Sequence, residues 1–218
     1  MSIKSEATRQ KILDAALSLF REKGFNAATM REIATRAGIA SGLAYYYFPS
    51  KEDMVAAFYK QANADLQPLL EDVHLGSKQF EGRIRAIVKT KMAYFAPHRN
   101  FLGALMGVAA DPAHRASPFA AETAAIREMD FKHFDRLLKE TGIKVTPDLV
   151  TLLPRLLWLY QMGIILFWIY DSSEGQTKSK ALLAKSAHIV ALLVKASGLP
   201  VLRPARKAVV EIAELILN

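Results

Sequence analysis

The chain has 218 residues, with 29 lysine and arginine side chains against 21 aspartate and glutamate, a formal net charge of +8. A basic balance of this kind favours a polyanionic partner, and the length is sufficient for a small N-terminal domain and a core of ordinary size. The sequence contains no cysteine, which excludes disulfides, thiolate catalysis and cysteine-bound zinc.

The first predicted helix begins at Ser5 or Thr8 and ends at Gly24, a residue that turns left-handed at no steric cost. Its apolar residues fall on one face at helical spacing, and they are Ile12, Leu13, Ala15, Ala16, Leu19 and Phe20. Residues 1–51 hold eight basic and four acidic side chains, half of the net charge of the whole chain. A module that faces DNA requires such an excess.

The stretch from Thr29 to Lys51 predicts two short helices joined by a tight turn. Thr29 and Glu32 have capping-box spacing, and Gly38 provides a left-handed end for the first helix. The second helix, roughly Ala40 to Tyr46 or Tyr47, is too short to be stable without neighbours. This pattern is typical of a helix-turn-helix that binds DNA.

The second of these helices ends in Tyr45, Tyr46, Tyr47 and Phe48. Successive helical residues point about 100° apart, so these rings cannot all enter one small core and at least one tyrosine must face outwards. Pro49 ends the helix, Ser50 and Asp53 can cap the next one, and Lys51 lies in its first turn. A cation there opposes the helix dipole unless an anion binds the free amides, so Lys51 is predicted to anchor a phosphate.

The segment Thr8–Met54 resembles the DNA-binding domain of the TetR (tetracycline repressor) family. The matching residues are Ile12, Ala15, Ala16, Phe20, Gly24, Phe25, Thr29, Ile33, Ala34, Ala37, Gly38, Gly42, Tyr45, Phe48, Lys51 and Glu52. The resemblance implies a dimeric transcriptional regulator, usually a repressor, with an all-α fold. It implies a three-helix helix-turn-helix domain at residues 1–51 and a helical ligand-binding and dimerisation domain at residues 52–218.

By position, the resemblance places nine residues at or near DNA: Thr29, Arg31, Ser41, Gly42, Leu43, Tyr45, Tyr46, Tyr47 and Lys51. The sequence departs from the family pattern at Ala40, where serine or threonine is usual and would cap the recognition helix; Ser41 is an alternative cap. Ser41 and Leu43 stand where the family often has polar or basic residues, so no lysine or arginine is available to read guanine. Base specificity is expected from Ser41, Leu43, Tyr47 and DNA shape.

The remainder of the chain predicts further helices. They cover residues 51 to beyond 70, with Pro68 as a kink or interruption, and then residues 80–95, 100–110, 119–141, 147–170, 178–196 and 204–217. The helix at 147–170 is apolar nearly all round and needs cover on every side. We expect it to pack internally on one side and, together with 178–196, against a second copy in a two-fold four-helix interface.

The longest uncharged run, Leu156–Tyr170, has 15 residues, fewer than the roughly 20 that span a bilayer. The polar N-terminus is unlike a secretory signal, so a cytoplasmic protein with no membrane partner is expected. The five histidines show no metal-binding spacing, and His133 is expected in a surface cluster with Asp130 and Asp135. The sequence has no glycine-rich phosphate-binding loop and no G-x-S-x-G motif. No enzyme activity, catalytic residue, metal or cofactor is therefore predicted.

The body is rich in methionine and aromatic side chains, which an adaptable apolar cavity uses but any helical core uses too. The predicted contacts to a small effector are Met92, Phe95, Arg99, Phe101, Met106, Ile126, Trp158 and Gln161. The main hypothesis is a repressor released from a pseudo-palindromic DNA operator by a small, partly apolar ligand. The alternative is an all-helical small-molecule carrier or membrane-surface protein with a vestigial DNA-binding head.

Overall fold

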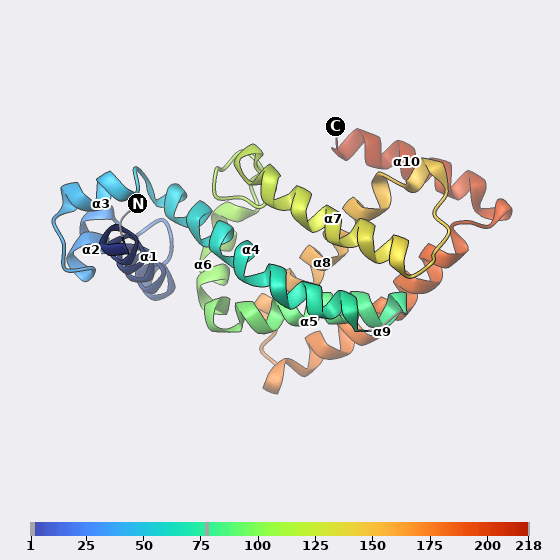
Figure 1. Cartoon of the computed structure of the whole chain (residues 1–218), viewed down its shortest axis with the longest axis horizontal. Coiled ribbons are helices and arrows are strands. Elements are labelled where there is room, and N and C mark those ends of the chain that lie inside the picture. Colours follow the sequence, from blue (N-terminus) through green and yellow to red (C-terminus); the bar gives the residue numbers. More distant parts are fainter. Residues whose placement is uncertain (1–2, 77–78, 218) are drawn as a thin grey trace. The chain divides into compact units, whose positions relative to one another are not determined.

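A computed structural model of the chain describes residues 3–76 and 79–217, which form α-helices, short 3-10 turns and loops with no β-strand among them (Figure 1). The helices are α1 (Ile3–Lys23), α2 (Met30–Arg36), α3 (Ser41–Tyr47), α4 (Lys51–Leu75), α5 (Phe80–Phe95), α6 (Arg99–Ala109), α7 (Ala124–Glu140), α8 (Leu152–Tyr170), α9 (Thr177–Ala196) and α10 (Arg203–Leu217). The predicted all-α fold class is confirmed.

The chain divides into two compact units. Unit 1 contains residues 1–65 and 95–127, and unit 2 contains residues 66–94 and 128–218. The boundaries therefore fall within α4, at the end of α5 and within α7. The domain boundary predicted at residue 51 coincides with the first residue of α4, and as a division of function it stays a prediction.

Unit 1 is organised around α1, which packs against α2 and α6. The predicted apolar stripe of α1 is its inner face, because Ile12, Ala16 and Phe20 are fully buried. The Phe20 ring stacks on Phe101 of α6 at a centroid distance of 5.9 Å and meets Phe25 at 5.2 Å. A fixed α1 gives α2 and α3 a rigid support.

In unit 2, α8 packs against α9. The side chain of Asp171, just after α8, accepts hydrogen bonds from the amides of Ser173 (2.9 Å) and Ser179 (2.8 Å), which fixes the loop between the two helices. By length and composition alone α8 could cross a membrane, but 44% of its most apolar window is buried within the protein. The core helix of a soluble protein meets the same criteria.

Several helix ends differ from the sequence expectations. The predicted helix at 147–170 is a 3-10 turn at Pro147–Leu149 followed by α8 from Leu152, because Pro154 has no amide hydrogen and is tolerated only in a first turn. Likewise, α7 begins at Ala124 after a 3-10 turn rather than at Phe119. The expected interruption at Pro68 does not occur, since α4 continues through it to Leu75.

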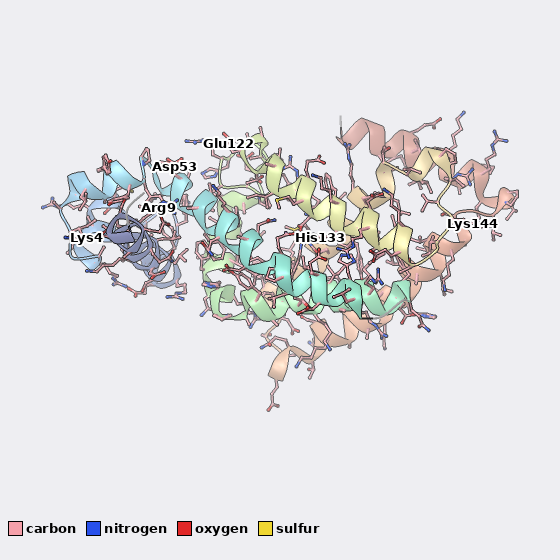
Figure 2. The ribbon with its side chains drawn as sticks, in the orientation of Figure 1. Lys4, Arg9, Asp53, Glu122, His133 and Lys144 are labelled. Atoms are coloured by element: carbon pink, nitrogen blue, oxygen red, sulfur yellow. The ribbon has the colours of Figure 1, made fainter. Side chains whose placement is uncertain are left out.

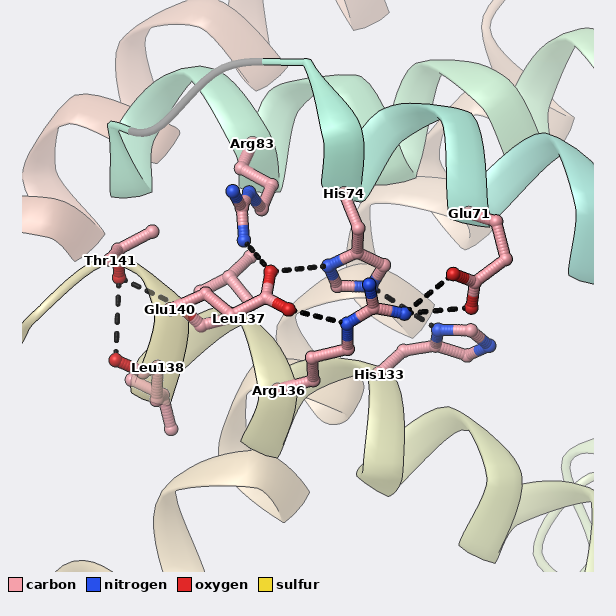
Figure 3. Close-up of polar contacts among 9 residues, drawn as sticks. All are labelled: Glu71, His74, Arg83, His133, Arg136, Leu137, Leu138, Glu140 and Thr141. Atoms are coloured by element: carbon pink, nitrogen blue, oxygen red, sulfur yellow. Dashed lines mark hydrogen bonds and ion pairs between the residues drawn. The ribbon is translucent and has the colours of Figure 1, made fainter.

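A polar cluster joins α4, α5 and α7 within unit 2 (Figure 3), and its His74, Arg83 and His133 are buried. The imidazoles of His74 and His133 lie 3.3 Å apart (Nε2 to Nδ1), and the other ring nitrogen of His133 is 3.1 Å from Gln67 Oε1. Glu140 accepts from Arg83 and, at 2.6 Å, from Arg136. The expectation that His133 belongs to a surface cluster is wrong, because only 7% of it is exposed and its partner lies 59 residues away in the sequence.

Candidate nucleic-acid interface

The first helix of the helix-turn-helix, α2, starts with the predicted capping box. The Glu32 amide donates to Thr29 Oγ1 at 3.3 Å, and the Thr29 amide donates to Glu32 Oε2 at 3.0 Å. The ammonium of Lys23 pairs with the same carboxylate, and these donors lower the pKa of Glu32 to about 2. The cap therefore stays charged and formed throughout the physiological pH range.

The turn between α2 and α3 is a Schellman motif centred on Gly38. Gly38 has φ +63°, its amide donates to the Thr35 carbonyl (3.0 Å), and the Ile39 amide donates to the Ala34 carbonyl (3.0 Å). Only glycine enters this left-handed conformation at no steric cost. The turn sets the direction in which α3 leaves α2.

Helix α3 buries one side and exposes the other. Ala44 and the following Phe48 are 0% and 1% exposed, whereas Tyr45 and Tyr46 are 52% and 79% exposed. Tyr47 is half-buried, and its hydroxyl donates to Ser5 Oγ at 3.2 Å. The prediction that at least one tyrosine faces outwards is confirmed, and two of the three do so.

The start of α3 lacks a side-chain cap. Its N-cap residue is Ala40, and no side chain hydrogen-bonds to the first turn. Ser41, the alternative cap, is instead the first helical residue, and it is exposed together with Gly42 and Leu43. Of the three positions predicted to read bases, Ser41 and Leu43 therefore share the outer surface of α3 with Tyr45 and Tyr46, whereas Tyr47 is half-buried.

Lys51 lies in the first turn of α4, where Ser50 Oγ accepts from the Asp53 amide at 3.2 Å as predicted. Its ammonium donates to the carbonyls of Phe25 (2.7 Å) and Asn26 (3.2 Å) and lies 4.7 Å from the centre of the Phe25 ring. Partial burial lowers the pKa of Lys51. No local pattern indicates this contact, because the two carbonyls lie in a loop 25 and 26 residues earlier in the sequence.

The cations of this region fall into two groups. Arg36 is held by Glu22 through a pair that includes a 2.7 Å hydrogen bond, and Arg9 lies over the Phe48 ring at 4.7 Å. Within the described part of the chain, the other group makes no ion pair and is exposed: Lys4, Lys11, Arg21 and Arg31. Figure 2 shows Lys4 and Arg9 on α1. The second group is available to an external anion.

The predicted effector contacts are divided between the two units and stay a prediction. Phe101 lies in the core of unit 1, where it meets Phe20 and Phe58 at centroid distances of 5.9 and 5.1 Å. The other candidates of unit 1, all half-buried, are Phe95, Arg99, Met106 and Ile126. In unit 2, Trp158 and Gln161 are buried in α8, while Met92 lines a groove between α5 and α9.

Two family models match most of this sequence. Residues 12–58 match bacterial regulatory proteins of the tetR family, and residues 83–212 match the tetracyclin repressor-like C-terminal domain. The chain belongs to the TetR family. The resemblance seen in residues 8–54 is thereby confirmed, and the second match extends the TetR assignment to the body, where the sequence alone offered only a pattern of helices.

Relatives of this TetR-family chain include named repressors. The HTH-type transcriptional repressor KstR2 of Rhodococcus jostii (strain RHA1) is 37% identical over 82 residues, which are 38% of this chain and 40% of that protein. KstR2 of Mycobacterium tuberculosis (strain ATCC 25618 / H37Rv) is 49% identical over 47 residues, 22% of this chain and 24% of that protein. These matches span less than half of the relatives' length.

Solved structures of TetR-family regulators share the fold over most of the chain. The regulator from Syntrophomonas wolfei is 19% identical with a TM-score of 0.69, and it matches 86% of this chain and 96% of its own. The regulator from Streptomyces coelicolor is 21% identical with a TM-score of 0.64, and it matches 99% of this chain and 90% of its own. The helical body is therefore a TetR-like body in its architecture.

Proposed function

We propose that this TetR-family protein is a dimeric DNA-binding transcriptional regulator, a repressor that leaves a pseudo-palindromic operator when a small, partly apolar ligand binds. The observation that carries the proposal is the exposed surface of α3. Tyr45 and Tyr46 face solvent while Ala44 and Phe48 anchor the helix from behind. A short helix that presents polar aromatic side chains from a rigid support suits insertion into a major groove.

Nine residues carry the proposed DNA contacts. Ser41, Leu43 and Tyr47 face base edges, where the hydroxyls of Ser41 and Tyr47 can hydrogen-bond to the bases and Leu43 can contact thymine methyls. The others contact or approach the DNA backbone: Thr29, Arg31, Gly42, Tyr45, Tyr46 and Lys51. Because no lysine or arginine stands at the base-reading positions, DNA shape supplies part of the specificity.

Lys51 keeps a role in this proposal despite its contacts within the protein. An ammonium has three N–H donors, and two of them bond to the carbonyls of Phe25 and Asn26. The third donor can bond to a phosphate oxygen. The carbonyls fix the position of the charge, so less side-chain entropy is lost on binding DNA.

The proposed dimer forms through α8 and α9. These helices expose large apolar side chains, which are Leu166, Phe167, Tyr170, Ile189, Leu192 and Leu193. Exposed apolar side chains on two packed helices mark an interaction site, and in the proposed dimer a second copy covers them with two-fold symmetry. The dimer presents two α3 helices to successive major grooves about 34–36 Å apart.

The family assignment favours this function over the alternative of a carrier or membrane-surface protein with a vestigial head. Access to chromosomal DNA places the protein in the cytoplasm. Of the predicted effector contacts we retain Met92, because it lines a groove of unit 2, whereas Phe101 is committed to the aromatic core of unit 1.

The decisive experiment selects genomic fragments with the purified protein and measures binding as a function of salt. We expect sequence-dependent binding, and we expect Arg31→Gln to weaken it on all sequences and to lower the salt slope by about one. Lys132→Gln is the matched control, since Lys132 is an exposed cation of α7 in unit 2. Co-sedimentation with lipid vesicles in the absence of any DNA binding would instead support the alternative.

A further inference from the structure

A groove of about 440 Å³ lies between α5 and α9, entirely within unit 2. Its volume falls in the range typical of small-molecule sites. Met92 and Leu183 form its apolar floor and are 9% and 3% exposed. The lining residues are Gly82, Arg85, Ala86, Lys89 and Met92 of α5 and Lys180, Leu183 and Ala184 of α9.

The groove arises from the sequence of the two helices. The lining residues of α5 recur at spacings of three and four, so they form one stripe along the helix, and those of α9 do the same. Small residues occupy the stripes where larger side chains would meet, namely Gly82, Ala86 and Ala184. The space between the helices therefore stays open instead of being filled by the core.

The rim of the groove is cationic. Arg85, Lys89 and Lys180 line it, and none of the lining residues is acidic. The Glu81 carboxylate, also on α5, lies 2.9 Å from His188 Nδ1 and 3.7 Å from Arg85. Among the side chains of residues 4–76 and 79–213, Lys89 and Lys180 have no ion-pair partner, so two of the three cations above the apolar floor lack an anionic partner there.

We propose that this groove binds an amphipathic organic anion, a molecule with one carboxylate or phosphate head and an aliphatic body. The aliphatic body lies on Met92 and Leu183, and the head lies between the ammonium groups of Lys89 and Lys180. A neutral apolar molecule would leave the cations unused, and a small inorganic anion would leave the floor exposed to water.

The groove stays accessible in the proposed dimer. Nine residues correspond to two and a half helical turns, so Ile189 lies on the side of α9 opposite Lys180. Of the exposed apolar residues of α9 assigned to the dimer, Ile189 and Leu193 are thus on a different side of the helix from the groove. A ligand and a second subunit can occupy α9 at the same time.

The inference names the class of effector that the proposed function requires. Release of DNA by this ligand rests on the proposed function, whereas binding of the ligand to the groove does not. Binding itself is measured without DNA, by calorimetry on the full chain with decanoate as the probe. We expect decanoate to bind more tightly than decan-1-ol, which lacks the charge, and than acetate, which lacks the apolar body. Binding should weaken as salt increases.

Variants locate the site. Each of Lys89→Gln and Lys180→Gln should weaken decanoate binding about threefold, and the double variant about tenfold. Ala184→Phe, which fills the groove from an exposed position of α9, should abolish it. The matched controls are Lys178→Gln and Ala181→Phe, exposed positions of the same helix outside the groove, and both should bind as the wild type does.

The proposal is overturned if decanoate does not bind, if decan-1-ol binds equally well, or if Ala184→Phe binds as tightly as Ala181→Phe. Release of DNA by decanoate is measured afterwards as a separate quantity. A chain that binds decanoate in the groove but binds no DNA contradicts the proposed regulator and leaves the ligand site standing. A chain that binds DNA but not decanoate contradicts the proposed ligand site and leaves the proposed regulator standing.

Discussion

Alanine at Gly38 and at Gly42 adds the same methyl group to two positions of the helix-turn-helix, and we expect opposite effects on stability. Gly38 has φ +63°, and a Cβ there would meet only the Lys11 ammonium at 3.7 Å, an ordinary contact. The cost of Gly38→Ala is therefore conformational, about 1–2 kcal/mol for an L-residue in the left-handed region. Gly42 lies inside α3 with nothing within 4 Å of a new Cβ, so Gly42→Ala should stabilise by about 0.5–1 kcal/mol.

Urea unfolding followed by far-ultraviolet circular dichroism measures both changes. The transition midpoint should move down for Gly38→Ala and up for Gly42→Ala with an unchanged slope. A midpoint for Gly38→Ala at or above that of the wild type would refute the reasoning from the Schellman turn. Gly42→Ala also separates folding from DNA binding, because a methyl group on the proposed DNA-facing surface should weaken operator affinity while the fold gains stability.

Three further substitutions or conditions test other contacts by the same unfolding assay. Ala40→Ser supplies the missing cap of α3 and should stabilise by about 1 kcal/mol; no change would mean that Ala40 is not the functional N-cap. Lys51→Met removes two charged hydrogen bonds, including the one to Phe25, and should destabilise by about 1 kcal/mol, whereas a variant as stable as the wild type would contradict those bonds. Burial is the main reason why the pKa of His74 and His133 is lowered in the folded chain. The unfolded chain therefore binds more protons, and the free energy of unfolding should fall as the pH decreases below about 6.5. The effect should shrink in a His74→Gln, His133→Gln double variant, and an unchanged pH dependence there would assign it to other groups.

Much of the helix-turn-helix could be predicted from the sequence because its determinants are local. The Thr29–Glu32 cap and the Gly38 turn each depend on residues within five positions of one another. That at least one of the three consecutive tyrosines faces outwards follows from helical geometry alone. The residues that determine these features are close together in the sequence, so the local pattern is sufficient to predict them.

The remaining features depend on residues that are distant in the sequence. The burial of His133 depends on His74, and the position of Phe101 depends on Phe20, 81 residues earlier. No periodicity within α6 or α7 indicates those partners. The start of α8 is a different case, because two local signals conflict. Pro154 lacks an amide hydrogen and indicates a helix start near Leu152, whereas Thr146 and Pro147 have the pattern of a helix N-terminus but begin only a 3-10 turn.

Helix α3 contributes little to the packed interior beyond Ala44, with Phe48 directly behind its last turn. Its exposed positions, among them Ser41, Leu43 and Tyr46, can therefore be randomised together with little risk to folding. A library at these positions, selected against altered operators, would retarget the protein while α1, α2 and the body stay as they are. Recognition could thus diversify during evolution faster than the scaffold that carries it.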